Sequence, residues 1–131
     1  MSRIVQKYGG SSVATTDLIR SVARRVARVH DRGTRIVGVV SAMGDTTDDL
    51  IDLANSVSSD PYAAAREMDM LLTAGERISM AVVAMAINDL GEDARSYTGS
   101  QAGLITDSTH GKARIVDLCD CLRAGREARS T

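Results

Sequence analysis

The stretch RIVQKYGGSS, residues 3–12, decides the fold. It begins with the β-branched pair Ile4-Val5, which is typical of a short buried strand, and then runs into Lys7, two glycines and two serines. A second stretch, RIVGVVSAMGDTT at residues 35–47, repeats this order of a strand followed by a small, hydroxyl-rich loop. In an open α/β sheet, ligands bind outside the carboxyl ends of the strands. The two loops therefore predict a ligand site at one edge of a sheet.

The residue types in the first loop indicate the chemistry of that ligand. Gly9 and Gly10 let the backbone approach a ligand closely, and successive N–H groups there can cradle an anion. Lys7 adds a point charge suited to phosphate. Since the second loop has a similar character, the pair favours a phosphate-handling site.

A helix is expected after each of these loops. The first starts at the cap Thr16-Asp17 and stops at Gly33, and its inward face is predicted to be Leu18, Val22, Val26 and Val29. Its opposite face carries Arg20, Arg24, Arg28 and Arg32, which form either an anion-binding surface or a solvated helix face, and we favour the second. The second helix begins near Asp48-Asp49, with Leu50, Ile51, Ala54 and Val57 inward.

The following stretch is predicted to be helical in two pieces. Asp60-Pro61 begins the first piece, with proline at the first helical position, and a break is expected near Thr73-Ala74-Gly75. The second piece runs from about Glu76 to Leu90 and is so apolar that we expect it to be buried on all sides. Glu76 is the exception: it is either a partner of the helix dipole or a carboxylate aimed into the site.

The order of these elements predicts an α/β fold, a mostly parallel sheet sandwiched by helices. Later strands are expected at residues 94–98, 104–106 and 111–116, with a third small polar loop at residues 99–103. We assign residues 1–117 to this domain and residues 118–131 to a divergent tail without a strand.

Composition excludes several classes of protein. With aromatic residues at 2% and a net charge of −1 over 131 residues, neither base stacking nor a general attraction to nucleic acid is expected. The start has no apolar signal region and no apolar run that we judge long enough to span a bilayer, so we expect a cytoplasmic protein without membrane contact. Cys119 and Cys121 stand without a second Cys or His cluster, so we expect no metal site there, and their role stays open.

Four motifs together resemble bacterial aspartokinase of the actinobacterial type. They occur in the family's order: VQKYGGSSV at residues 5–13, VSAMGDTTD at 40–48, LTAGER at 72–77 and TGSQAG at 98–103. The first is not a Walker loop, because its lysine precedes the glycines. The resemblance covers roughly residues 3–117 and implies an amino-acid-kinase-like fold.

The resemblance also implies an activity and a set of roles. The activity is transfer of a phosphoryl group from ATP, with Mg²⁺, to the side-chain carboxylate of L-aspartate, the first step toward lysine, threonine and methionine. Lys7 would bridge the transferring phosphate, Gly9, Gly10 and Ser11 would lend backbone N–H groups, and Ser41 would lie near the phosphates. The aspartate would be held by Asp45, Thr46, Thr47 and Glu76, the last pairing with its ammonium group.

The chain also departs from the family pattern. The Gly-Arg-Gly-Gly-Ser-Asp loop and the half that grips adenine and ribose are absent, and the resemblance stops at Asp117. We therefore expect an incomplete domain from a truncated or frameshifted reading frame, inactive by itself. Two alternatives stay open: a non-catalytic module that binds an amino acid or anion, and a partner that docks with a full-length kinase. In either case exposed strand edges favour a homo-oligomer or association with that kinase.

Overall fold

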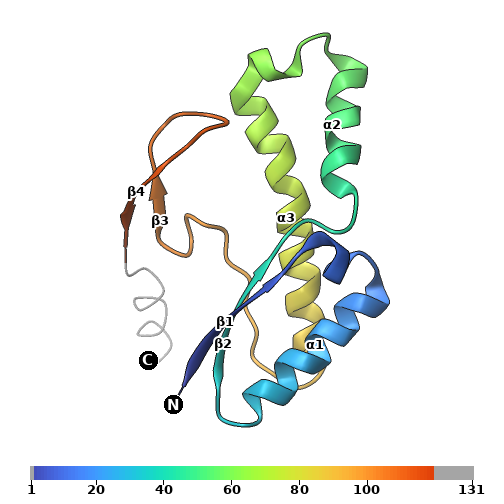
Figure 1. The fold of residues 1–131 in the computed structure, drawn as a ribbon, viewed down its shortest axis with the longest axis vertical. Helices are drawn as coiled ribbons and strands as arrows, with labels where there is room; N and C mark the ends of the chain where they lie inside the picture. Colours follow the sequence, from blue (N-terminus) through green and yellow to red (C-terminus); the bar gives the residue numbers. More distant parts are fainter. Residues whose placement is uncertain (1, 120–131) are drawn as a thin grey trace. The chain divides into compact units, whose positions relative to one another are not determined.

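The computed structural model describes residues 2–119, which fall into two compact units, Met1–Ser96 and Tyr97–Thr131. The first unit contains every helix of the described chain and two strands (Figure 1). Its elements, in order, are β1 (Arg3–Tyr8), the 3-10 turn η1 (Gly10–Val13), α1 (Thr16–His30), β2 (Arg35–Val40), α2 (Thr46–Val57), the 3-10 turn η2 (Pro61–Ala64) and α3 (Ala65–Asn88). The second unit contains β3 (Leu104–Thr106) and β4 (Ile115–Leu118).

The two predicted strands β1 and β2 pair in parallel, as an α/β fold requires. Their register runs from Arg3 opposite Arg35 to Tyr8 opposite Val40 without a shift. Tyr8, on one face of this pair, packs with residues of η1, α1 and α3 in the core cluster of the unit, which comprises Tyr8, Val13, Ile19, Val22 and Val83. The other face stays open within the described residues, since Val5, Val37 and Val39 are 69, 43 and 47% exposed. The predicted fold class is confirmed, and the described helices cover one face of the pair.

Helix α1 is capped by Thr15, one residue before the predicted cap Thr16-Asp17, and its predicted inward face is right at Val22, which is buried, and at Val26, which packs against the core. The Thr15 side chain accepts a hydrogen bond from the Leu18 backbone N–H and caps the helix. The buried residues are Ile19, Val22 and Ala23, whereas Leu18 is 40% exposed, so the prediction for Leu18 is wrong. Ile19, Val22 and Ala23 have the i, i+3, i+4 spacing of one helix face.

Helix α2 also begins where the sequence indicates, with Asp48 and Asp49 in its first turn. Ala54 is buried against the rest of the unit, but Val57 is 80% exposed. The predicted inward position of Val57 is therefore wrong.

Helix α3 is one continuous helix of 24 residues, and the predicted break at Thr73-Ala74-Gly75 is wrong. Its start after the proline turn is as expected, because η2 has Pro61 at its beginning and the Asp60 side chain accepts a hydrogen bond from Ala63 N–H. Since Glu76 lies near the middle of α3, its interpretation as a partner of the helix dipole is also wrong.

The prediction that the second half of α3 is buried on all sides fails as well. Ile78 and Met85 are 54 and 64% exposed, although Ser79 and Val83 are buried. Only one side of the helix faces α1 and α2, which both contact it. By length and composition the segment Pro61–Asn88 is long and apolar enough to cross a membrane, contrary to the sequence-based expectation. The core helix of a soluble protein meets the same test, and α3 contributes Val83 to the core of its unit.

The segment that follows α3 is irregular, so the strand predicted at residues 94–98 is wrong. The Asn88 side chain accounts for this at the start of the segment. Its Oδ1 accepts from Ala94 N–H at 2.7 Å, and its Nδ2 donates to Ala94 O at 3.1 Å. Because a side chain already satisfies the backbone of Ala94, no strand partner is needed there.

The second unit is a short antiparallel pair in which Leu104 lies opposite Leu118. Strand β3 matches the prediction at residues 104–106, whereas β4 begins at Ile115, later than the predicted strand at 111–116. Leu118 belongs to β4, so the expectation that the segment from residue 118 has no strand is wrong at that residue. Residues 120–131, including Cys121, lie outside the described part, and the domain boundary at residue 117 stays a prediction.

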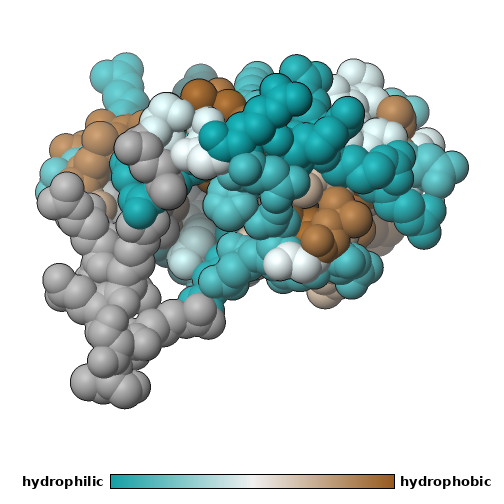
Figure 2. All heavy atoms as spheres, turned by 90° about the horizontal axis from the view of Figure 1, so that it is seen from below, coloured by the Kyte–Doolittle hydropathy of each residue, from teal (hydrophilic) through white to brown (hydrophobic). Residues whose placement is uncertain are grey.

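The surface of the described residues is mixed. On the face shown in Figure 2, hydrophilic residues predominate and hydrophobic ones form separate small areas.

Candidate active site at the carboxyl ends of β1 and β2

Two backbone hydrogen bonds hold the predicted loops side by side. Ser41 N–H donates to Tyr8 O at 3.0 Å, which continues the pairing of the strands past their ends. Gly44 N–H donates to Gly10 O at 3.1 Å, which joins the middle of one loop to the middle of the other. The two loops therefore form one rigid wall rather than two independent segments.

Gly10 is required for this close approach. A Cβ atom at this position would lie 3.0 Å from Ala42 O and 3.2 Å from Gly44 O, both backbone atoms that cannot rotate away. Any side chain would push the loops apart and lengthen the bond between Gly44 and Gly10. The glycine thus shapes the wall directly.

Helix α3 closes the site on a third side through Gly75. A Cβ atom at Gly75 would meet Ala42 Cβ at 3.0 Å and Thr46 Cγ2 at 3.5 Å, so the helix backbone lies directly against the second loop and the start of α2. The glycine that suggests a helix break in the sequence is a packing residue in the structure. Glu76, the next residue, flanks this contact.

The predicted phosphate-binding residues lie around the end of β1. Lys7 is exposed and is an immediate neighbour of the buried Tyr8, so strand alternation places its side chain on the opposite face of the sheet. Gly9 precedes η1 and accepts a hydrogen bond from Ser12 N–H at 2.9 Å. Ser11 is exposed within η1, and Ser41 follows β2, half-buried.

Three of the four predicted aspartate-binding residues lie at the start of α2. Asp45 is the N-cap residue of this helix, but its exposed carboxylate makes no capping hydrogen bond. Thr46 donates its hydroxyl to Met43 O at 2.6 Å, which leaves oxygen lone pairs as its means of contact with a ligand. Thr47 is half-buried. A helix N-terminus at this place favours negative groups of a ligand, although Asp48 and Asp49 already occupy the first turn.

Glu76 is an exposed carboxylate, and among the described residues no hydrogen bond or ion pair engages it. The described structure thus brings together the loop after β1, the loop after β2 and the middle of α3. It does not place the third predicted loop, because residues 99–103 belong to the second unit. That loop is ordered by its own contacts, in which Thr98 N–H donates to Gln101 Oε1 at 3.0 Å.

The sequence interpretation missed Tyr8 as a supporting residue. Its ring is 8% exposed in the core, and its hydroxyl donates to Gln6 Oε1 at 2.6 Å. Burial raises the pKa of the Tyr8 phenol above its usual value, an effect that the nearby Arg25 guanidinium partly opposes. Because the buried Tyr8 ring holds the end of β1 against the core, it fixes the position of the backbone from which the Lys7 side chain extends on the other face. The alternation of core-facing and outward residues along the strand was the signal that could have found it.

The fit of a metal can be judged from the donor groups. No group of three His, Cys, Asp or Glu side chains that could hold an ion occurs within residues 2–119. Mg²⁺ commonly binds through one or two carboxylates together with the phosphates of its nucleotide. The uncapped Asp45 carboxylate is compatible with that mode, in which the metal arrives as part of the substrate.

Comparisons with known proteins agree with this arrangement. Residues 2–125 match the model of the amino acid kinase family. The chain is 64% identical over 118 residues to the aspartokinase of Mycolicibacterium smegmatis, 62% to that of Mycobacterium tuberculosis and 58% to that of Corynebacterium glutamicum. Each match covers 90% of this chain and 28% of the relative, so the chain spans little more than a quarter of the length of these curated relatives.

A solved structure supports the same assignment. The crystal structure of aspartate kinase from Synechocystis superposes with a TM-score of 0.73 at 47% sequence identity, covering 78% of this chain and 17% of that one. The parallel pairing of β1 and β2, the joined loops and the family match lead to one conclusion: the chain belongs to the amino acid kinase family.

Proposed function

We propose that this chain supplies the aspartate-binding and phosphate-binding part of an aspartokinase. The observation that carries the proposal is the rigid wall formed by the two loops, with Gly75 of α3 packed against it. The names of the relatives supply the substrate class, since proteins that share 58–64% of their residues with this chain are aspartokinases. In that family role the chain acts in the cytoplasm.

The reaction joins a carboxylate oxygen of L-aspartate to the γ-phosphorus of MgATP. As this O–P bond forms, the bond from the γ-phosphorus to the bridging oxygen breaks, and ADP leaves with the electron pair. The products are 4-phospho-L-aspartate and ADP. Positioning and charge neutralisation provide most of the catalysis in phosphoryl transfer, so no covalent intermediate with the protein is needed.

Charged groups of the wall fit distinct roles in this step. The Lys7 ammonium neutralises charge on the transferring phosphoryl group, and the N–H groups near Gly9, Gly10 and Ser11 hold its oxygens. Glu76 pairs with the substrate ammonium. The substrate is further oriented by Asp45, Thr46 and Thr47, while Ser41 lies beside the phosphates.

A kinetic test separates these roles, using this chain joined to the remaining part of the M. smegmatis relative. Lys7→Ala should lower kcat on the order of 10²-fold, because its contact strengthens in the transition state. Glu76→Ala should raise the KM for aspartate and leave the KM for ATP nearly unchanged. Arg3→Ala, at the other end of β1 from the loop, and Arg77→Ala, next to Glu76, are controls, since both remove exposed cations that have no proposed role.

The acyl phosphate is measured by trapping it with hydroxylamine. If Glu76→Ala changed thermal stability but not the aspartate KM, Glu76 would be withdrawn from the site. If Lys7→Ala left kcat intact, the phosphate assignment would fail. For the 131-residue polypeptide alone we expect no hydroxamate above the blank, and turnover by it would contradict that expectation.

The exposed sheet face supports the alternative of a docking partner. Val5, Val37 and Val39 present an apolar strip that another chain can cover, either a second copy or a full-length kinase. Size-exclusion chromatography with light scattering should show association that Val37→Lys weakens. A monomer at all concentrations that also fails to bind the M. smegmatis relative would argue against this role.

A further inference from the structure

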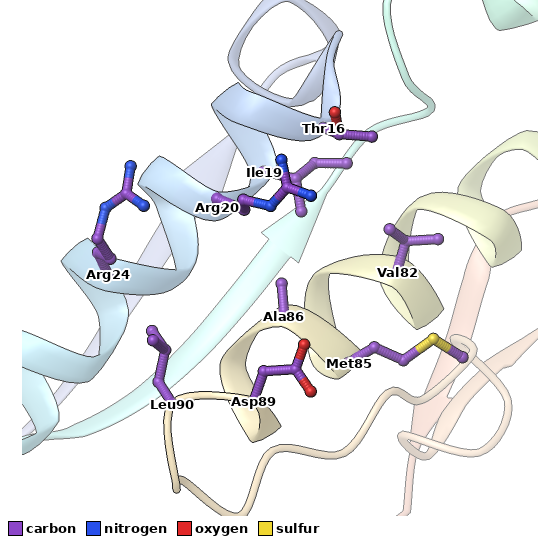
Figure 3. Close-up of a pocket in the computed structure, with 9 residues that line it drawn as sticks. All are labelled: Thr16, Ile19, Arg20, Arg24, Val82, Met85, Ala86, Asp89 and Leu90. Atoms are coloured by element: carbon purple, nitrogen blue, oxygen red, sulfur yellow. The ribbon is translucent and has the colours of Figure 1, made fainter.

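A second concave site lies between α1 and α3, apart from the wall of loops. It is an open groove of about 340 Å³, and none of the residues assigned to the active site lines it (Figure 3). Its apolar lining includes Ile19 from α1 and Val82 and Ala86 from α3. The volume is at the lower end of the range for small-molecule sites.

One rim of the groove carries two cations of α1, Arg20 and Arg24 (Figure 3). Arg24 Nη2 donates to Ser21 Oγ at 3.0 Å, and Arg20 is the one nearer Ile19 in Figure 3. The Arg20 side chain lies beside Ile19 on α1 and lines the groove (Figure 3). Its Nη1 contacts Asp17 Oδ1 at 3.0 Å, but the two side chains are 63 and 91% exposed, so the pair is weak in water. A guanidinium has five N–H donors, and this single contact leaves most of them free for a carboxylate.

The opposite rim carries an anion in an unfavourable place. Asp89 is the C-cap residue of α3, where the helix dipole disfavours a negative charge. Its carboxylate has no hydrogen-bond or ion-pair partner within the described residues. A cation bound beside the Asp89 carboxylate would offset the unfavourable helix dipole and would give the carboxylate an ion-pair partner.

We propose that this groove binds a small zwitterion with an aliphatic body, the chemical class of the aliphatic α-amino acids. Its carboxylate pairs with Arg20, its ammonium with Asp89, and its side chain covers Ile19, Val82 and Ala86. A simple carboxylic acid would leave Asp89 without a cation, and a simple amine would leave Arg20 without an anion. Met85, 64% exposed at the edge, is a flexible side chain that can fold over the bound body.

Binding is tested by calorimetry with three probes that share one aliphatic body. L-Leucine carries both charges, 3-methylbutylamine only the ammonium and 4-methylpentanoate only the carboxylate. We expect L-leucine to bind with a Kd on the order of 0.1–1 mM, as suits a ligand of this size, and the other two at least tenfold more weakly. Equal binding of all three, or none of L-leucine at 20 mM, would overturn the proposal.

Variants locate the site and separate it from the proposed kinase function. Arg20→Gln and Asp89→Asn should each weaken L-leucine binding at least tenfold, and Ala86→Leu should fill the groove and abolish it. Arg28→Gln is the matched control, an exposed arginine two turns along α1 that does not line the groove. Glu76→Ala should leave L-leucine binding unchanged.

Asp89→Asn provides a second readout. Because it removes a charge that the helix dipole disfavours, it should raise Tm without ligand while reducing the increase in Tm that L-leucine produces. Loss of binding through damage to the fold would instead lower both values. An Asp89→Asn protein that keeps the full increase in Tm with L-leucine would refute the assignment of Asp89.

Discussion

Gly75→Ala tests the packing that joins α3 to the second loop. Two effects of opposite sign compete at this position. Alanine is favoured over glycine inside a helix by about 0.8–1.0 kcal/mol, and Gly75 lies well inside α3. Against this, the new Cβ would lie 3.0 Å from Ala42 Cβ, closer than side chains normally pack.

Overpacking of this kind costs about 1–3 kcal/mol. The net change for Gly75→Ala is then between no effect and a loss of about 2 kcal/mol in the free energy of unfolding. Only the contact with Ala42 Cβ is too short, because Thr46 Cγ2 at 3.5 Å and Leu50 Cδ1 at 3.6 Å are at ordinary distances from the new Cβ atom. Removing the Ala42 side chain should therefore remove the cost. In an Ala42→Gly background the clash disappears, and Gly75→Ala should stabilise by about 1 kcal/mol.

The assay is a double-mutant cycle measured by urea denaturation of the four proteins. We expect a coupling energy of about 1–3 kcal/mol between the two positions, the cost of the clash. If Gly75→Ala stabilised the protein equally in both backgrounds, the coupling would be zero. That result would refute the direct contact of α3 with the second loop, and with it the placement of Glu76 beside the active site.

Three further predictions concern single side chains. Ser79 is completely buried and its hydroxyl has no partner in the described structure, so Ser79→Ala should stabilise the protein by about 1–2 kcal/mol, and a loss of stability would contradict this. The raised pKa of Tyr8 means that its contribution to stability is present below pH 10.0, the usual phenol value, and is lost as the pH rises through the folded-state pKa. The phenol absorbance of the unsubstituted protein and of Tyr8→Phe is titrated with pH, and the difference between the two curves reports Tyr8. We expect this difference to have its midpoint above pH 10.0, and a midpoint below that value would refute the argument that burial raises the pKa. The hydrogen bond that the Thr109 backbone N–H donates to Asp107 Oδ1 lowers the pKa of Asp107. The Thr109 amide resonance should therefore shift with a midpoint below 3.8, and a higher midpoint would contradict the contact.

The strands and the positions of the two loops could be predicted because they depend on local sequence. Both strands are short β-branched runs that end in small polar residues, a pattern that needs no knowledge of distant contacts. The proposed site residues came from the same loops and from a motif on α3. Their convergence depends on the parallel pairing, which the α/β order predicts.

The sequence-based predictions are wrong where a contact between residues that are not neighbours in the sequence determines the secondary structure or the burial of a side chain. The low helix propensity of Gly75 suggests a helix break, but the helix continues through it. Ala42 leaves little room for a Cβ atom at this position, and the other residues of the long helix offset the unfavourable propensity of glycine. The strand at residues 94–98 fails because Asn88, six residues before Ala94, satisfies its backbone. Leu18 and Ile19 differ little in apolarity, so only the packing of α1 on α3 determines which one is buried.

The structure also explains why small residues dominate around the proposed active site. Gly10 packs against the backbone oxygen of Ala42 and Gly75 packs against its Cβ atom, so neither glycine position leaves normal room for a Cβ atom. Together with the backbone hydrogen bonds between the two loops, this packing fixes the path of their backbone. The backbone N–H groups of the loops are therefore held in place by these contacts, whereas the side chains of Lys7, Asp45 and Glu76 are exposed. Preorganised donors of this kind lose little energy to reorientation when charge develops on a phosphoryl group, which is the requirement that phosphoryl transfer places on its site.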